Sequence, residues 1–541
     1  MDVNIAKQNE MSKSEAAIWF WTVVLAFAGI WIFLPSLFHS GYKSDVIEMQ
    51  LVAKEWVLAT RKHPMLPSWI LEIINLLTNR SFVAPFIAAS FCTIITLFSV
   101  WQLARQVLSE QLALIGTFSM LPFWTLTVES VNYNHNSTLI ACWALTTLMF
   151  YNAFQTNKKR WWIAAGLTLG LGFHAKYTIV LLAFALLFYS LWFPKFRRYW
   201  KEIGPWITIA TTFVVFLPHL ICLYHIGFWS TTLYAIDNAI QEEVWRISSH
   251  FIYPIRWVAC LLGLIIISPI LLLLPSLGTK WTLRAPRSEI EKEASQYLLC
   301  CMALPFFVLF LIPLSGSALE ASHGMPLCFF LGVYLLLRFQ RRDSASVFRQ
   351  TLCWTSLAIL AKVIVFVVMA VASPYLTGTA RAFHFPMREL GAECDRIWSS
   401  RFDSPVPYIS GHPTYAGSAA WAMKDHPSVH FYCRFCERSN IAGLNTQPTG
   451  TWSTDDDVNQ KGGIILWMAS APPDRRSNLF SGIRLRDEVS EIRDLPVPDW
   501  VHMRFPRAEV LPEILELPHK TGANIPPLRI GIAIIPPPEN L

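Results

Sequence analysis

The feature that most constrains this chain is a series of apolar runs, each near the length of a helix that crosses a lipid bilayer. Such a helix needs about 20 predominantly apolar residues. Hydrophobic residues make up 53% of the 541 residues and charged residues only 15%, whereas soluble domains carry about 25% charged residues. Apolar runs lie at residues 18–38, 82–104, 110–127, 137–155, 161–174, 177–194, 203–224, 254–275, 297–314, 326–339 and 351–376. The pattern predicts a polytopic α-helical membrane protein with about eleven transmembrane helices.

The distribution of basic residues predicts how these helices are oriented. Lys and Arg are enriched in loops on the cytoplasmic side of a membrane. In this chain they cluster on alternate connections, at residues 7–13, 158–160, 195–201, 280–292 and 341–349. We therefore expect a cytoplasmic N-terminus, an uncleaved first helix, and an extracytoplasmic location for residues 39–81, 128–136, 225–250, 315–326 and the segment after residue 376.

The C-terminal segment has a different pattern from the rest. It contains no spanning run, and short strand-like segments such as PVPYISG and GGIILWMAS alternate with polar and helical ones. We predict a transmembrane domain at residues 1–376, with its first outer loop at 39–81, and a soluble extracytoplasmic α/β domain at residues 377–541.

The first outer loop is unusually rich in ionisable residues. Outer loops are normally poor in cations, yet this one holds Lys43, Lys54, Arg61, Lys62 and Arg80. An anionic ligand such as a phosphate explains these cations, because Lys and Arg are the residues that bind phosphate. The alternative is that a long loop simply has a mixed, solvated surface.

Two acidic residues of this loop have the spacing of a helix face. Asp45 and Glu48 are three residues apart, so on a helix they can act as a base and its partner, or bind a cation. Acids near a first helical turn also offset the helix dipole, which is the alternative. The apolar spacing of the loop predicts two amphipathic helices on the membrane surface, separated by Pro64 and Pro67.

Polar residues also gather next to later apolar runs. Asn134 and Asn136 lie in the second outer segment, VESVNYNHN, where amides either bind sugar hydroxyls or form turns. Lys176 lies between two apolar runs, and an ionisable residue at membrane depth is a functional candidate unless its side chain reaches the interface. His323, in SHGMP, is either a site residue or a polar end group of a helix.

The C-terminal segment offers weak metal-binding spacing. The stretch HPSVHFYCRFC contains His426, His430, Cys433 and Cys436, which have spacings that zinc sites use. There is one C-x-x-C and no second cluster, and a disulfide between Cys394 and one of the pair is the alternative. Residues 455–457, three aspartates, are expected to form a solvated turn. We predict no metal site and no cofactor, and the spacing does not support a divalent cation.

The first outer loop resembles that of the GT-C class of membrane glycosyltransferases. Its D-x-x-E, E-W and K-H-P-M-L-P-S-W segments are similar to the bacterial branch related to protein mannosyltransferases and to the aminoarabinose and galacturonic acid transferases of lipid A. The resemblance continues through NYNHNSTLIACWALTTLMF, LGLGFHAKYT, SHGMP and PVPYISGHPTYAGSAAWAMKDHPSVHF, and so covers most of the chain. Two positions depart from the family pattern: Met65 replaces a second proline, and His323 replaces a frequent tryptophan.

The resemblance implies a sugar donor linked to polyprenyl phosphate and an inverting transfer to an acceptor outside the cytoplasm. The expected acceptor is lipid A or lipopolysaccharide, another envelope glycan or a protein, and the expected location is the bacterial inner membrane. Membrane lipids are expected partners, and nucleic acids are not. The residues that the resemblance assigns are Asp45 and Glu48 for catalysis, Lys62, His63 and Lys176 for the donor phosphate, and Asn134, Asn136, Tyr177 and His323 for the sugar or the acceptor.

A transporter or flippase of lipid-linked sugars is the alternative from another class. Transporters of this kind are built from inverted repeats with Gly- or Pro-broken helices near the middle of the membrane. This sequence instead concentrates charge in its outer loops and adds a large segment after the last apolar run. These features favour the glycosyltransferase.

Overall fold

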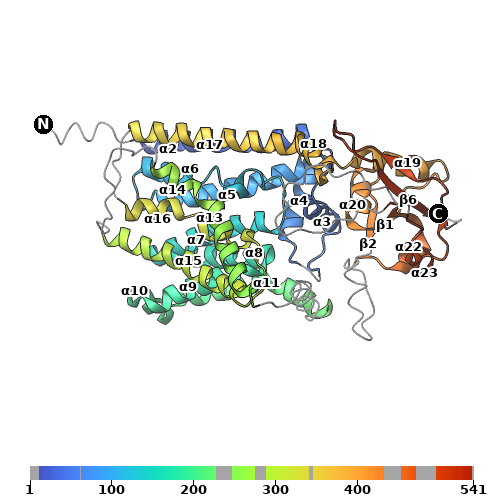
Figure 1. The fold of residues 1–541 in the computed structure, drawn as a ribbon. Helices are drawn as coiled ribbons and strands as arrows, with labels where there is room; N and C mark the ends of the chain where they lie inside the picture. Colours follow the sequence, from blue (N-terminus) through green and yellow to red (C-terminus); the bar gives the residue numbers. More distant parts are fainter. Residues whose placement is uncertain are drawn as a thin grey trace. The chain divides into compact units, whose positions relative to one another are not determined.

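The computed structural model describes residues 11–60, 63–226, 247–273, 288–339, 345–431, 452–470 and 495–538, and it is mostly helical (Figure 1). Within these residues seven helical segments are long and apolar enough to cross a membrane, and two bent helix pairs raise this number to nine. The seven are α2 (Lys13–Phe38), α5 (Ala84–Ala104), α7 (His135–Thr156), α11 (Ile203–Ile226), α13 with α14 (Ser249–Ile265 and Ile267–Leu273), α15 (Glu289–Leu314) and α17 (Ala345–Val371). A polytopic helical protein with a C-terminal α/β region is thus confirmed.

The structure differs in detail from the predicted count of about eleven transmembrane helices. The apolar run at 110–127 folds as a nine-residue helix, α6 (Glu110–Phe118), followed by the 3-10 turn η1 (Trp124–Leu126). The run at 161–174 lies in α8 (Lys159–Ala175), which has 17 residues. Hydropathy counts apolar residues without registering where the backbone stops being helical, and this accounts for the difference.

The chain divides into two compact units, which are described separately. The first comprises Met1–Phe33, Arg61–Pro67 and Pro85–Ile364, and the second comprises Leu34–Thr60, Ser68–Ala84 and Val365–Leu541. The predicted division at residue 376 did not anticipate that most of the first loop belongs to the same unit as the C-terminal residues.

In the first unit, α8 packs closely against α7 and α11. Gly166 and Gly170 of α8 make this approach possible: a Cβ atom at Gly166 would lie 2.7 Å from the carbonyl oxygen of Thr208, and one at Gly170 would lie 2.7 Å from Cβ of Val215. The hydroxyl of Thr208 donates to the carbonyl of Trp162 over 2.8 Å. Small residues that let two helix backbones meet are a common packing device in membranes, where no hydrophobic force drives helices together.

Further helix contacts complete this unit. α15 packs on α9 and α13, and α6 packs on α16. The bent pairs consist of η2 and α9 with α10 and η3, which meet at 95°, and of η5 with α16, which meet at 48°. Their bounds are η2 Tyr177–Ile179, α9 Val180–Trp192, α10 Pro194–Arg197, η3 Arg198–Lys201, η5 Ala321–Cys328 and α16 Leu331–Arg338.

The second unit contains a mixed sheet with the order β2-β1-β3-β6-β4, in which β5 also pairs with β6. β1 is parallel to β2 and β3, whereas β6 is antiparallel to its neighbours. Its central strands are apolar and buried, as expected for strands covered on both faces. The described strands are β1 (Tyr408–Gly411), β2 (Ser428–Phe431), β3 (Gly463–Met468), β4 (Glu509–Val510), β5 (Leu515–Leu517) and β6 (Leu528–Ile535).

Helices alternate with the strands of this sheet along the chain, as in an α/β domain. α20 connects β1 to the parallel strand β2, which is the usual role of a crossover helix. The other helical elements of the unit after α17 are α18 (Ser373–Thr377), η6 (Ala382–His384), α19 (Met387–Ser399), α20 (Pro413–Ala422), α22 (Asp455–Lys461) and α23 (Asp499–Arg504). α19 packs along α20.

A buried polar network links β2, α22 and α23. His430 is fully buried, and its ring nitrogens lie 2.9 Å from Ser453 Oγ and 2.7 Å from Asp455 Oδ1. Arg504 donates to both oxygens of the same carboxylate, over 2.7 and 2.5 Å. The expected solvated turn is therefore wrong for Asp455, because this residue pairs with the half-buried Arg504 and binds the buried imidazole of His430. Both ring nitrogens of His430 are already occupied, which does not fit a zinc ligand. Cys433 and Cys436 lie outside the described residues.

The close approach of α8 and α11 can be tested with Gly170→Leu. Leucine overpacks the contact with Val215, and overpacking a well-packed interior costs about 1–3 kcal/mol. We expect a lower melting temperature for the full-length protein in detergent. Gly263→Leu in α13 is the matched control, because a Cβ atom there meets nothing within 4 Å. Equal melting temperatures for the two variants would contradict the packing argument.

The His430–Asp455–Arg504 network should make the second unit sensitive to acid. Burial alone raises the pKa of Asp455, but hydrogen bonds from His430 and Arg504 outweigh burial and lower the pKa from 3.8 to about 2. The network therefore contributes stability above about pH 4 that is lost as the pH falls towards 2. Amide hydrogen exchange in β2 and α22, corrected for its intrinsic pH dependence, should accelerate over this range.

The same measurement identifies the residue responsible. Asp455→Asn should give fast exchange already at pH 7, since it removes the charge-assisted hydrogen bonds of a buried group, a loss of about 1–3 kcal/mol. The neighbouring, exposed Asp456 provides the control, and Asp456→Asn should behave like the wild type. Slow exchange in Asp455→Asn at neutral pH would show that the network is dispensable.

Candidate active site

Pro64 and Pro67 of the first loop are held against the start of α7, within the first unit. The ring of His135 lies 3.1 Å from the carbonyl oxygen of Pro64 through its Nε2 atom, and the hydroxyl of Tyr133 donates to the carbonyl of Pro67 over 2.8 Å. His63 stacks obliquely on His135, with 4.1 Å between ring centroids. Tyr133 and His135 are themselves buried. The carbonyls of Pro64 and Pro67 are therefore fixed by contacts that a proline can still make although it lacks an N–H.

Lys176 is brought to the same helix end. It follows directly after α8, and its ammonium group donates to Asn136 Oδ1 over 2.8 Å. The amide oxygen of Asn134 caps α7 by accepting the backbone N–H of Asn136, also over 2.8 Å. The ammonium group of Lys176 also interacts electrostatically with the half-buried ring of His323, which η5 supplies. The first loop, the start of α7, the end of α8 and η5 thus converge on one cluster.

Tyr177 extends this cluster into the bundle. Its hydroxyl lies 2.7 Å from Nε2 of His219, a fully buried residue of α11. The neighbouring His174 is anchored by the carbonyl of Val215 at 2.9 Å. Because both histidines are held by α11, the turn that carries Lys176 is fixed at both of its flanks.

The two acidic candidates lie on α3 (Ser44–Lys54), in the second unit. Asp45 occupies the first turn and Glu48 the next, and both side chains are half-buried. The remaining sides of α3 are buried: Val46, Ile47, Met49, Gln50, Leu51, Val52 and Ala53. The prediction that this segment forms an amphipathic helix on the membrane surface is thus wrong for α3, because protein encloses this helix on most sides.

α20 of the sheet domain is the principal neighbour of α3. A Cβ atom at Gly417 would lie 2.5 Å from Cγ2 of Ile47 and 3.0 Å from Leu51, so only glycine allows the two helices to approach this closely. Beyond the end of α3, Glu55 accepts a hydrogen bond from the hydroxyl of Ser428 over 2.7 Å, and Lys54 donates to the carbonyl of His426. The C-terminal sheet therefore holds the helix that carries Asp45 and Glu48.

α4 (Leu66–Leu77) supports α3 from within the loop. Asn75 donates to Gln50 Oε1 over 2.6 Å, and the buried carboxylate of Glu72 pairs with Arg80. One of the loop cations is thus accounted for by an ion pair. The opposite side of α4 exposes Leu76 and Leu77, as expected for a helix whose apolar side faces lipid.

The predicted site residues therefore fall into two groups. The first unit brings together His63, Asn134, Asn136, Lys176, Tyr177 and His323. The second unit holds Asp45 and Glu48 on one helix. Lys62 lies outside the described residues. The predictions missed the anchors His135, Glu55 and Ser428; the periodic pattern gave no signal for the last two, because their partners are more than 370 residues apart.

The described residues contain no group of three or more His, Cys, Asp or Glu side chains arranged to hold a metal ion. Lys176 is the cation that the described residues bring to the start of α7. This arrangement suits an anionic ligand such as a phosphate.

Comparison with known proteins agrees with this chemistry. Residues 62–222 match the family model described as dolichyl-phosphate-mannose-protein mannosyltransferase. The structure is similar to ArnT from Cupriavidus metallidurans bound to undecaprenyl phosphate, at 11% identity and a TM-score of 0.54, over 97% of this chain and 99% of that one. It is also similar to ArnT from the same organism in the apo state, at 11% identity and a TM-score of 0.56, over 96% and 98% of the two chains. No curated protein matches the sequence.

Over residues 62–222 the chain is therefore similar to the mannosyltransferases that this family model describes, and it shares the fold of the two ArnT structures. The matched segment begins at the K-H-P motif and includes α7, α8 and Lys176, so it covers the cluster of the first unit except for His323.

The contact of α20 with α3 can be tested with Gly417→Ala. The added methyl group must displace Ile47, and with it α3, and a displacement of about 1 Å at a catalytic group can cost about 100-fold in rate. We expect sugar transfer to slow about 10- to 100-fold. Alanine favours helix more than glycine does, so unfolding of α20 is not the expected cause.

A compensating change provides the control. Ile47→Ala removes the methyl group that the new Cβ atom meets, so the double variant should recover part of the lost activity. Losses that simply add in the double variant would show that the two residues do not act through their contact.

Proposed function

We propose that this enzyme moves a sugar from a polyprenyl-phosphate carrier to an acceptor on the extracytoplasmic side of the bacterial inner membrane. The observation that carries the proposal is the cluster of the first unit, where Lys176 donates to Asn136 and His63 packs on the neighbouring His135. The ArnT structure of similar fold contains undecaprenyl phosphate. The acceptor is lipid A or lipopolysaccharide, another envelope glycan or a protein.

The cluster of the first unit serves the donor. Lys62, His63 and Lys176 bind its phosphate and stabilise the negative charge that grows on the leaving polyprenyl phosphate. Asn136 orients Lys176 through their hydrogen bond, and Asn134 holds Asn136 by capping α7. Tyr177 and His323 line the binding site of the sugar. With lysines in this role, transfer should need no divalent cation.

Asp45 serves the acceptor. An acceptor hydroxyl attacks the anomeric carbon from the side opposite the phosphate, its proton passes to the Asp45 carboxylate, and the bond from carbon to phosphate oxygen breaks with its electron pair on the leaving group. The anomeric configuration is therefore inverted. Glu48, one turn along α3, orients the acceptor. If the acceptor is a phosphate group, it is already ionised and Asp45 orients it without taking a proton.

Orientation in the membrane follows from charge. The basic connections place the N-terminus in the cytoplasm, and the sheet domain then lies in the extracytoplasmic space with Asp45. The family match favours transfer over transport, because the model that matches residues 62–222 describes a mannosyltransferase.

Transfer of radiolabelled sugar from an undecaprenyl-phosphate donor to an envelope-lipid acceptor, with EDTA present, tests these roles. Asp45→Asn should slow transfer to a hydroxyl acceptor by about 10²- to 10⁴-fold, the contribution of a general base. Lys176→Met should slow it by about 10²- to 10³-fold, as for loss of one group that stabilises a developing charge. Lys292→Met, at an exposed lysine of α15 paired with Glu289, is the matched control and should be neutral.

The pH dependence separates the two roles of Asp45. With a hydroxyl acceptor the transfer needs an ionised base, so the rate should fall in acid, and Asp45→Asn should remove that dependence. With a phosphate acceptor the dependence should be missing in the wild type as well. Unchanged transfer by Asp45→Asn with every acceptor would refute the assignment.

A further inference from the structure

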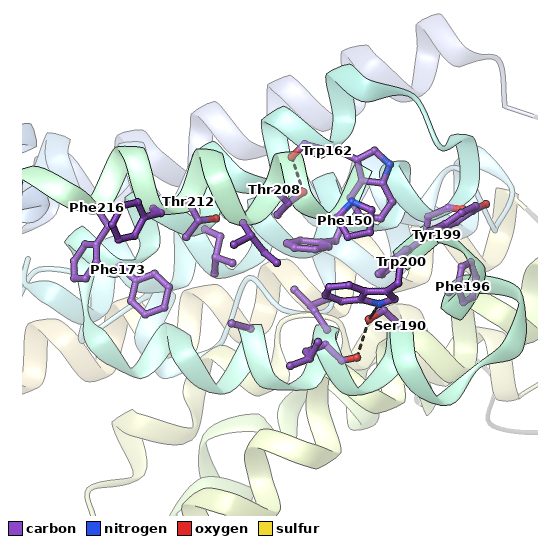
Figure 2. A pocket seen from close by; sticks show the side chains of 18 residues that line it. Phe150, Trp162, Phe173, Ser190, Phe196, Tyr199, Trp200, Thr208, Thr212 and Phe216 are labelled. Carbon is purple, nitrogen blue, oxygen red and sulfur yellow. Dashed lines mark hydrogen bonds between the residues drawn. The ribbon is translucent and has the colours of Figure 1, made fainter. Parts of the chain in front are cut away.

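A long apolar groove runs along the helices of the first unit, at a place that the proposed reaction does not use. Its volume is about 380 Å³, within the range of small-molecule pockets. α7, α8, α9 and α11 form its length, and α10 and η3 close one end. Figure 2 shows Phe173 and Phe216 towards one end of it and Phe196, Tyr199 and Trp200 towards the other.

The lining of this groove suits a hydrocarbon chain. Its few polar groups are already bonded within the protein: Thr208 donates to the carbonyl of Trp162, Thr212 to the carbonyl of Gly166, and Trp200 to the hydroxyl of Ser190. A ligand with polar atoms would find no partner among these groups, and burying an unpaired polar atom is costly. An aliphatic chain loses nothing there.

The end formed by α10 and η3 carries exposed cations. Arg197, Arg198 and Lys201 follow one another around it, and the guanidinium of Arg198 lies 5.4 Å from the centre of the Tyr199 ring. The nearby acid Glu202 is held by Asn157 over 2.5 Å, and Lys195 is paired with Glu293. Positive charge therefore prevails at this end.

Exposed tryptophans mark the same end as the level of lipid headgroups. Trp192 and Trp206 are 64% and 54% exposed, and tryptophan is enriched where hydrocarbon meets headgroups. A lipid whose chain enters the groove at this level has its headgroup beside the cations.

The cationic end is remote from the donor cluster. Lys176 follows the last residue of α8, whereas the cationic end lies where α9 stops, at the other end of the α8–α9 hairpin. The 17 residues of α8 separate the two by about 25 Å. A phosphate bound at Lys176 is therefore not the phosphate that the cationic end would meet.

From these features we infer that the groove binds one acyl chain of an anionic phospholipid, with its headgroup phosphate at Arg198 and Lys201. The ligand belongs to the leaflet opposite the donor cluster. It fills the space between α9 and α11, and so stabilises the helices that carry the turn of Lys176 and Tyr177. The site is distinct from that of the sugar donor and does not depend on the proposed reaction.

Thermal unfolding of the full-length protein in detergent tests this site. Added phosphatidylglycerol should raise the melting temperature by a few degrees, and phosphatidylcholine with the same acyl chains should raise it less. Leu187→Trp should abolish the difference, because Leu187 lines the groove. Leu191→Trp is the matched control, one turn further along α9, with 45% exposure against 43% for Leu187 and no place in the lining.

The headgroup contacts are tested separately, because Leu187→Trp alone risks a folding defect. Arg198→Gln with Lys201→Gln changes only exposed side chains, and it should remove the preference for phosphatidylglycerol over phosphatidylcholine. Equal effects of the two lipids on the wild type would overturn the proposal. So would a shift that Leu187→Trp leaves intact, or one produced by undecaprenyl phosphate and not by phosphatidylglycerol, which would assign the groove to the donor.

Discussion

Two carbonyl oxygens in the first loop fix the arrangement on which the cluster of the first unit depends. His135 and Tyr133, both buried at the start of α7, hold the carbonyls of Pro64 and Pro67. The proline rings limit the backbone of this segment, so two hydrogen bonds are enough to set its path. The same helix start presents Asn136 to Lys176. One helix terminus thus orders a loop and a distant lysine together.

Much of this could be predicted from the sequence, for physical reasons. A bilayer requires long apolar helices, so the fold class follows from hydropathy. Charged residues beside apolar runs are costly unless they have a function, which singled out Lys176, and the K-H-P motif pointed to His63. Helix count was less predictable: α6 ends after nine residues inside an apolar run, because apolar composition does not report where a helix stops.

The contacts that connect distant parts of the chain could not be predicted in this way. Ser428 binds Glu55, and Asp455 joins His430 to Arg504, although neither pair is periodic or adjacent in sequence. Three consecutive aspartates look like a solvated turn when the strand beside them is unknown. Asp455 shows that a charge run can contain one residue with a buried partner while its neighbour Asp456 stays exposed.

The seating of α3 on α20 bears on how the sheet domain can be exchanged between related proteins. Gly417 leaves no room for a side chain against Ile47, and Ser428 binds Glu55 at the end of the same helix. The sheet domain is therefore not an appendage that evolution or an engineer can exchange alone. A chimaera that takes residues 377–541 from a relative must also take residues 39–60. The part that has to be exchanged therefore consists of two separate segments of the sequence.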